Sequence, residues 1–194
     1  MSNIKFIGDL SIQDALILAE FAKKSDYILE FGSGGSTQIF AQCLPKIVIS
    51  VETSPKWIEI TQKRLKMIDN ISKVQFTTYD NYPIQKYDLI FVDGVDELRR
   101  DFAIKTWELL TVDGFMIFHD TRRFADFQNA TWIAQLFHNE INRMDINIRN
   151  SNMTVIHKKI AQPYVNWNLS EDKPIWAYGA APNPDGDVLW PIEN

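Results

Sequence analysis

Two periodicities alternate along the first 160 residues of the chain. Short runs rich in aliphatic and aromatic residues predict buried strands, at residues 27–31, 46–52, 73–80, 87–94 and 115–120. Longer segments in which apolar residues recur every three or four positions predict helices, at residues 11–25, 36–44, 54–68, 97–110 and 129–141. A turn is predicted at residues 111–114, and two last strands follow one another around an Asn-Ser-Asn turn within residues 146–159.

Strands that alternate with helices predict a parallel sheet covered on both faces. The final two strands have no helix between them, so they imply an antiparallel element at one edge. The predicted fold class is α/β: a doubly wound, mostly parallel seven-stranded sheet with an antiparallel C-terminal edge hairpin, in a three-layer α/β/α arrangement.

Two of the predicted helices carry start signals. Ser11 can cap the first helix, and Ser54 can cap the third, where Pro55 occupies the first helical position. The first helix has an apolar stripe at helical spacing, made of Ile12, Ala15, Leu16, Ala19 and Ala22.

The pattern stops near the end of the chain. Residues 161–194 hold five of the eight prolines and show no periodicity, which is typical of a disordered tail. Five aromatic residues in the same segment argue against disorder, because disordered segments are usually poor in aromatic residues. We therefore expect one domain at residues 1–160 and an ordered C-terminal arm at residues 161–194, packed on the domain or on a partner, such as a second copy in a homodimer.

Charge and cysteine content narrow the classes of partner. The net charge is −5, so no global positive field draws the chain toward nucleic acid or an anionic membrane. Cys43 is the single cysteine and cannot form an internal disulfide, which fits a reducing compartment. No apolar run approaches the ~18 residues of a membrane span, and the N-terminus lacks the apolar core of a signal peptide. We expect a cytoplasmic protein without nucleic-acid or membrane partners.

Unusual polar residues follow every one of the first five predicted strands. In a doubly wound sheet, ligands bind at the carboxyl ends of the strands, where the strand order reverses. The five clusters are Glu30–Thr37, Glu52–Thr53, Asp80–Asn81, Asp93–Gly94 and His119–Asp120. Their coincidence predicts a ligand site at this edge of the sheet.

The first cluster, "EFGSGGST", restricts the kind of ligand. Its glycines permit a tight turn and close approach of backbone to ligand. Glu52 lies 20 residues beyond Gly32, about where an acid that binds ribose hydroxyls belongs. Glu30 would repel the pyrophosphate of a dinucleotide and attract an ammonium group, unless it only braces the loop by accepting backbone N–H bonds. The chain also has no Gly-Lys-Ser/Thr sequence of a P-loop. An adenosine-bearing, cationic ligand without phosphate points to S-adenosylmethionine.

Four segments carry a resemblance to a family: "LEFGSGGST", "VISVET", "YDLIFVDG" and "LLTVDGFMIFHD". From about residue 27 to residue 159 the chain resembles the class I, Rossmann-like S-adenosylmethionine-dependent methyltransferases, in their small-molecule branch. The resemblance implies that S-adenosylmethionine is the cofactor and S-adenosylhomocysteine the product. The residues that it assigns to the cofactor are Glu30, Gly32, Ser33, Gly34, Ser36, Thr37, Glu52, Thr53, Asp80 and Asp93. The amino acid moiety would lie at Glu30 and the glycine loop, the ribose at Glu52, and adenine at Thr53 and Asp80.

The end of the fifth strand is expected to carry the chemistry. Methyl transfer depends mainly on positioning, helped by a base when the acceptor loses a proton. His119 has a suitable pKa for that base, and Asp120 could orient it or bind the acceptor; alternatively, His119 only caps the strand. In metal-dependent catechol-type relatives, an Asp after the fourth strand and an Asp-Asn pair after the fifth hold a divalent cation. Asp93, His119 and Asp120 match this only partly, so a divalent metal stays open but is not favoured.

Arginines near the same strand ends bear on the acceptor. Guanidinium groups suit carboxylates and phosphates, so Arg99, Arg122 and Arg123 are candidates to bind an anionic acceptor. The alternative is that they pair with neighbouring acids on the surface. The sequence as a whole favours methyl transfer to an oxygen of a small anionic or sugar-like molecule. A non-catalytic binding module of the same fold, or another nucleotide-cofactor enzyme such as a dehydrogenase, stays open.

Overall fold

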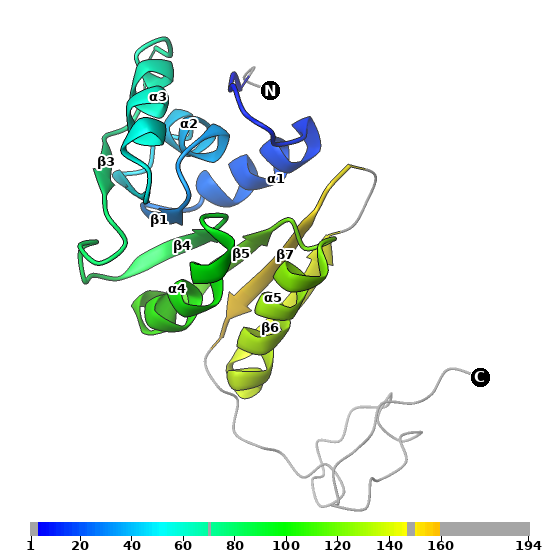
Figure 1. Ribbon diagram of the computed structural model, residues 1–194. Coiled ribbons are helices and arrows are strands. Elements are labelled where there is room, and N and C mark those ends of the chain that lie inside the picture. Colours follow the sequence, from blue (N-terminus) through cyan, green and yellow to red (C-terminus); the bar gives the residue numbers. More distant parts are fainter. Residues whose placement is uncertain (1–3, 70, 147–149, 160–194) are drawn as a thin grey trace, which may run out of the picture. The chain divides into compact units, whose positions relative to one another are not determined.

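A computed structural model describes residues 4–69, 71–146 and 150–159, and the predicted arm at residues 161–194 lies outside the described residues. Seven strands form one sheet in the order β3-β2-β1-β4-β5-β7-β6 (Figure 1). Their bounds are β1 Tyr27–Phe31, β2 Ile47–Val51, β3 Val74–Thr77, β4 Tyr87–Val92, β5 Leu110–His119, β6 Ile141–Ile146 and β7 Met153–Lys158. The first five pair in parallel, whereas β7 is antiparallel to both β5 and β6. The predicted fold class is confirmed.

Helices cover both faces of the sheet. Their bounds are α1 Ile12–Ala22, α2 Gly35–Gln42, α3 Pro55–Leu65, α4 Arg99–Thr106 and α5 Phe124–Leu136, with single 3-10 turns at Asp96–Leu98, Trp107–Leu109 and His138–Glu140. One apolar core joins the sheet to α4 and α5, and the other joins it to α1 and α2. These two cores give the three predicted layers.

The stripe predicted for α1 is partly wrong. Ser11 caps the helix by accepting the Asp14 backbone N–H at 3.0 Å, as predicted. Ile12 and Leu16, however, are 76% and 44% exposed, and the buried face is completed by Leu18. Leu18 lies three positions after Ala15 and four positions before Ala22, so it shares their face of the helix. This face packs against the sheet and α2.

Predicted boundaries shift around β5 and β6. The turn expected at residues 111–114 is absorbed into β5, which begins at Leu110; the register against β4 shifts there, and Asp113 adopts a φ of +64°. The Asp-Gly pair therefore makes an irregularity within β5 instead of a turn before it. β6 starts at Ile141, before the predicted position, and α5 begins at Phe124 instead of residue 129.

The topology sets where a ligand can bind. From β1 the chain runs to β2 and then to β3 on one side, and it crosses back from β3 to β4 on the other side of β1, so the strand order reverses between β1 and β4. A crevice forms at the carboxyl ends of strands at such a point. Among the described residues, no helix is long and apolar enough to span a membrane.

Candidate functional site

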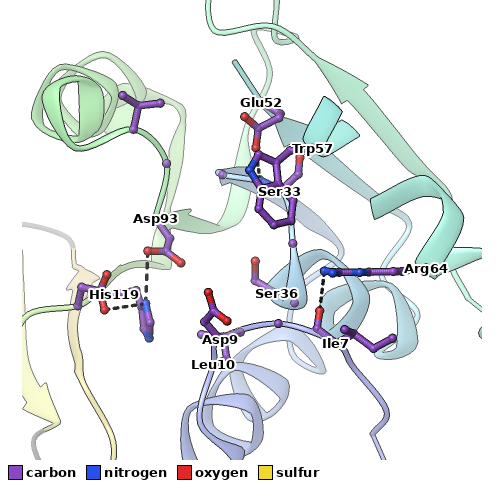
Figure 2. Close-up of a pocket in the computed structure, with 17 residues that line it drawn as sticks. Ile7, Asp9, Leu10, Ser33, Ser36, Glu52, Trp57, Arg64, Asp93 and His119 are labelled. Atoms are coloured by element: carbon purple, nitrogen blue, oxygen red, sulfur yellow. Dashed lines mark hydrogen bonds and ion pairs between the residues drawn. The ribbon is translucent and has the colours of Figure 1, made fainter. Parts of the chain in front are cut away.

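A cavity of about 560 Å³ lies at the carboxyl ends of β1, β2, β4 and β5 (Figure 2). Its volume is in the range of ordinary cofactor sites. Four parts of the chain line it: residues 7–10, the glycine loop at residues 32–36, the strand-end residues Glu52, Asp93, Gly94, Val95, His119 and Asp120, and Trp57 and Arg64 of α3. Eight of the sequence-predicted site residues face this cavity: Gly32, Ser33, Gly34, Ser36, Glu52, Asp93, His119 and Asp120.

The glycine loop needs its first glycine for two reasons. Gly32 has a φ of +100°, in the region that side chains rarely adopt, and its N–H donates to Val51 O at 2.9 Å. A Cβ at Gly32 would lie 2.6 Å from the carbonyl oxygen of Asp93, so there is no space for one. The loop is thereby held against the end of β4, where its backbone faces the cavity.

Glu52 is anchored at the end of β2 by backbone donors. Its Oε2 accepts the Ser33 N–H at 2.9 Å, and its Oε1 accepts the Ser54 N–H at 2.8 Å. This carboxylate therefore joins the glycine loop to the start of α3. Oε1 also accepts a long hydrogen bond from Thr53 Oγ1, whereas Oε2 keeps a second lone pair, so a ligand hydroxyl can still be bound at Oε2.

Glu30 lies beneath the loop instead of in the cavity. Its side chain is fully buried, and Ser36 Oγ donates to its Oε2 at 2.8 Å. Burial raises the pKa of Glu30 to about 7, although hydroxyl groups of Thr37, Ser50 and Ser36 oppose the shift. This position matches the alternative in which the residue braces the loop. The carboxylates that face the cavity are instead Asp9, Glu52, Asp93 and Asp120.

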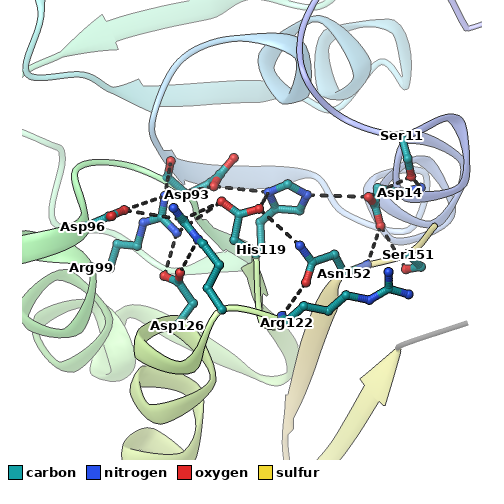
Figure 3. Close-up of polar contacts among 12 residues, drawn as sticks. Ser11, Asp14, Asp93, Asp96, Arg99, His119, Arg122, Asp126, Ser151 and Asn152 are labelled. Atoms are coloured by element: carbon teal, nitrogen blue, oxygen red, sulfur yellow. Dashed lines mark hydrogen bonds and ion pairs between the residues drawn. The ribbon is translucent and has the colours of Figure 1, made fainter. Parts of the chain in front are cut away.

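His119 is surrounded by three carboxylates (Figure 3). Its Nδ1 lies 3.3 Å from Asp93 Oδ1 and 3.5 Å from Asp120 Oδ1, and its Nε2 lies 3.6 Å from Asp14 Oδ2. Burial by itself would lower the pKa of His119, but hydrogen bonds to Asp14 and Asp93 and the charges of Asp93 and Asp120 raise it to about 10. The imidazole is therefore protonated at neutral pH.

Asp14 connects α1 to the turn before β7 and to the end of β5. It is buried and accepts hydrogen bonds from Ser11 Oγ at 2.8 Å, Ser151 Oγ at 2.9 Å and the Asn152 N–H at 3.1 Å. Burial would raise the pKa of Asp14, but the hydrogen bonds from His119 and these groups lower it to about 2. Asp14 therefore stays charged and fixes the second nitrogen of the His119 ring.

Asp120 combines an unusual backbone with several partners. Its φ is +59°, a left-handed conformation that Asp tolerates better than most residues. Asn152 Nδ2 donates to Oδ1 at 3.2 Å, and Arg123 Nη2 lies 2.5 Å from Oδ2. The strained turn directs this carboxylate to the cavity, where the side chain is 29% exposed.

The three predicted arginines are not among the residues that line the cavity. Arg99 is buried, and its guanidinium lies 2.6 Å from Asp126, 3.1 Å from Asp96 and 3.3 Å from Asp93. Arg123 is half exposed and also pairs with Asp126, at 2.9 Å. The Arg122 backbone N–H donates to Asn152 Oδ1 at 2.5 Å. None of these arginines lines the cavity, and an acceptor-binding role stays a prediction.

Three more residues assigned to the cofactor do not line this cavity: Thr53 and Asp80, which were predicted to contact adenine, and Thr37. Thr53 Oγ1 donates to Glu52 Oε1 at 3.4 Å, and Thr37 is buried at the start of α2, where its Oγ1 accepts the Gly34 N–H. Asp80 lines a second cavity of about 340 Å³ with Tyr79, Tyr82, Ile84, Lys105 and Leu109.

Asp93, His119 and Asp120 each offer one possible metal-ligand atom, and these atoms lie within 4.8 Å of one another. Both carboxylates already pair with cations of the described chain, Asp93 with Arg99 and His119 and Asp120 with Arg123 and His119. Asp93 Oδ1 lies 3.3 Å from both Arg99 Nη2 and His119 Nδ1, so a divalent cation would have to displace the ring proton beside a fixed guanidinium. The residues fit a protonated His119 better than a metal ion, and the absence of a metal stays a prediction.

Sequence reasoning missed four residues at this site: Asp9, Asp14, Trp57 and Arg64. Trp57 lies in the first turn of a helix whose start was predicted directly after Glu52, so its position was available from the sequence. Asp14 had no such signal, because its partners Ser151 and Asn152 are 137 and 138 residues away.

No family model matches the chain, and no curated protein matches its sequence. Solved structures do match. A methyltransferase-like protein from Silicibacter pomeroyi is 18% identical with a TM-score of 0.59, over 83% of this chain and 93% of the other. The O-methyltransferase TomG from Streptomyces achromogenes, in complex with S-adenosylmethionine, is 14% identical with a TM-score of 0.63, over 78% and 82%. An O-methyltransferase from Bacillus cereus, in complex with S-adenosylhomocysteine, is 16% identical with a TM-score of 0.61, over 81% and 86%. The chain has the Rossmann-like fold of these methyltransferases.

Proposed function

We propose that the chain is an S-adenosylmethionine-dependent methyltransferase that acts on a small molecule. The observation that carries this proposal is the cavity itself, in which the glycine loop, the anchored Glu52 and the ends of β4 and β5 meet. Its four carboxylates suit a ligand that carries a sulfonium and an ammonium group and no phosphate. Proteins of the same fold were crystallised with S-adenosylmethionine or S-adenosylhomocysteine, which supports the same ligand here.

The roles in cofactor binding follow from position. Glu52 accepts hydrogen bonds from the ribose hydroxyls, and the loop from Gly32 to Ser36 binds the amino acid end. Trp57 is 46% exposed on the cavity wall and offers a flat apolar surface on which adenine can stack. Thr53 and Asp80 remain candidates for the adenine edge.

The reaction breaks the bond between the cofactor's sulfur and its methyl carbon and forms a bond from that carbon to an acceptor oxygen. The hydroxyl proton of the acceptor must leave in the process. A protonated His119 does not take up this proton at neutral pH, so we assign proton acceptance to Asp120, whose carboxylate faces the cavity. His119 holds Asp93 and Asp120 at fixed distances, which serves positioning. The acceptor in this proposal is an anionic or sugar-like molecule, which Arg122 and Arg123 orient.

Calorimetry tests the cofactor assignment. The full chain is titrated with S-adenosylhomocysteine and, separately, with NAD. We expect binding of the first and no heat from the second, whereas NAD binding alone would identify another kind of nucleotide enzyme and overturn the proposal.

Turnover is tested with S-adenosylmethionine that carries a labelled methyl group and a panel of hydroxylated carboxylates, phosphates and sugar nucleotides. Label transferred to an acceptor oxygen supports the enzyme. Cofactor binding without transfer to any acceptor class would favour a non-catalytic module.

A further inference from the structure

The N-terminal strap, residues 4–10, is attached to α2 by two glutamine side chains. Gln42 accepts the Lys5 N–H at 3.0 Å and donates to Lys5 O at 2.7 Å. Gln38 does the same for Ile7, at 3.0 Å and 2.9 Å. The two glutamines are one helical turn apart, so their amides pair with alternate strap residues much as a neighbouring strand would.

The strap is also fixed against the glycine loop. Gln38 Nε2 donates to Gly34 O at 2.9 Å as well as to Ile7 O, so one amide joins strap and loop. A Cβ added to Gly8 would lie 3.0 Å from Gly35 Cα, which shows how closely the two backbones approach. Arg64 Nη1 of α3 donates to Ile7 O at 3.0 Å. These contacts place Asp9, the next strap residue after Gly8, at the start of α2.

Asp9 differs from the other carboxylates of the cavity. Its side chain points into the cavity in Figure 2, and Asp9 is exposed. Glu52 is held by backbone N–H groups, and Asp93 and Asp120 by arginine and histidine. Within the part of the chain that the structure describes, no hydrogen bond or ion pair of the Asp9 carboxylate is present. Its charge is therefore available to a ligand cation at the end of the cavity next to the glycine loop.

We propose that Asp9 binds the ammonium group of the amino acid end of S-adenosylmethionine, and that the strap makes the site selective for ligands with that group. This inference rests on the proposed function, because it concerns the same cavity and cofactor. It gives the ammonium-binding role that the sequence assigned to Glu30 to a carboxylate that faces the cavity.

The test compares two ligands on the full chain and on Asp9→Asn. S-adenosylhomocysteine carries the amino acid end, whereas 5′-methylthioadenosine has the same adenosine thioether without it. We expect Asp9→Asn to weaken S-adenosylhomocysteine binding by about tenfold or more while changing methylthioadenosine binding by less than about threefold. The loss should shrink in high salt, because the site is open to solvent. Asp113→Asn, at the opposite end of β5, is the matched control and should bind both ligands as the wild type does.

Each outcome separates this inference from the proposed function. If the wild type binds S-adenosylhomocysteine and Asp9→Asn binds it equally well, the inference is overturned and the proposed function stands. An equal loss for both ligands would also overturn it, because Asp9 would then act on the shape of the cavity and not on the ammonium group. If the wild type binds neither ligand, the proposed function fails and this inference fails with it. Retained methylthioadenosine binding by Asp9→Asn shows that the variant is folded.

Discussion

At the scale of single residues, the chemistry of His119 depends on side chains that are distant in sequence. A histidine with an ordinary pKa near 6.5 would be a fair general base. Here Asp14 from the first helix, Asp93 from the end of β4 and the adjacent Asp120 surround the ring and keep it protonated. The role of His119 therefore changes from accepting a proton to holding two carboxylates in place.

Replacing Asp14 tests this electrostatic arrangement. The folded-state pKa of His119 is raised to about 10, so its contribution to stability is complete below about pH 6.5 and is lost as pH rises through 10. In Asp14→Asn we expect a shallower fall of the unfolding free energy between pH 6.5 and 10, and ~1–3 kcal/mol lower stability at pH 6.5. Urea unfolding at several pH values measures both.

Asp26→Asn is the control for this experiment, because Asp26 is exposed and its carboxylate pairs with the exposed Lys46 at 2.8 Å, far from His119 in the sequence. It should leave the pH dependence unchanged. Equal slopes in wild type and Asp14→Asn would show that Asp14 does not set the charge of His119.

Arg123 offers a test of the acceptor. Its guanidinium is half exposed and pairs with Asp120, which lines the cavity, and with the buried Asp126. If it also orients an anionic acceptor, Arg123→Gln should raise the acceptor KM about tenfold and leave the Kd for S-adenosylhomocysteine nearly unchanged. Steady-state kinetics with calorimetry gives the two numbers. Equal changes in both would count against an acceptor role.

At the scale of elements, the glycine loop and the N-terminal strap form one unit. Gln38 of α2 bonds to both, and Glu52 bonds to the loop and to the start of α3. These contacts join the ends of β1 and β2 to the starts of α2 and α3 on one side of the cavity. A change in the loop backbone should therefore lower the affinity for the ligand as well as the stability of the fold.

Gly32→Ala tests that coupling. The added Cβ would meet Asp93 O at 2.6 Å at a φ of +100°, so the loop must move away from β4. We expect a loss of stability of ~2 kcal/mol and at least a tenfold loss of S-adenosylhomocysteine affinity. Thermal unfolding and calorimetry check the two effects. Unchanged S-adenosylhomocysteine affinity in a folded Gly32→Ala variant would contradict the argument.

At the scale of the whole molecule, the sheet topology decides which charges meet. Strand order places the ends of β1, β2, β4 and β5 at one edge, and the N-terminal strap and the turn before β7 close around them. Arg99, His119 and Arg123 lie among five carboxylates: Asp14, Asp93, Asp96, Asp120 and Asp126. The three cations are fewer than the carboxylates, but they already pair with Asp93 and Asp120 at the strand ends, which bears on whether methyl transfer would need a metal ion.

We expect methyl transfer to continue after removal of divalent cations. Excess EDTA followed by desalting should leave the initial rate within about twofold, because Arg99 and His119 already occupy the Asp93 carboxylate that a cation would need. Added Mg²⁺ should not raise the rate. A loss of activity with EDTA that Mg²⁺ restores would show that a metal displaces the proton of His119.

Several residues that line the cavity could be predicted from the sequence, because their positions at the strand ends follow from local rules. Glu52, Asp93 and His119 each end a short apolar strand, and the carboxyl ends of neighbouring parallel strands share one edge of a sheet. Gly32 was accessible because the turn after β1 requires backbone freedom. Glu30 was misleading, since a strand-end carboxylate can point toward the ligand or beneath the loop, and only side-chain packing distinguishes the two.

The sequence by itself determined the first five strands, their alternation with helices, the closing antiparallel pair and the edge at which polar residues gather, because each depends on short-range periodicity; it placed β6 too late in the chain. The tertiary structure alone decided which carboxylates face the cavity and whether the His119 ring stays protonated. Those properties depend on burial and on contacts such as that of Asp14 with Ser151, made across more than a hundred residues. Desolvation and Coulomb energies act through space, so their outcome is known only once the chain has folded.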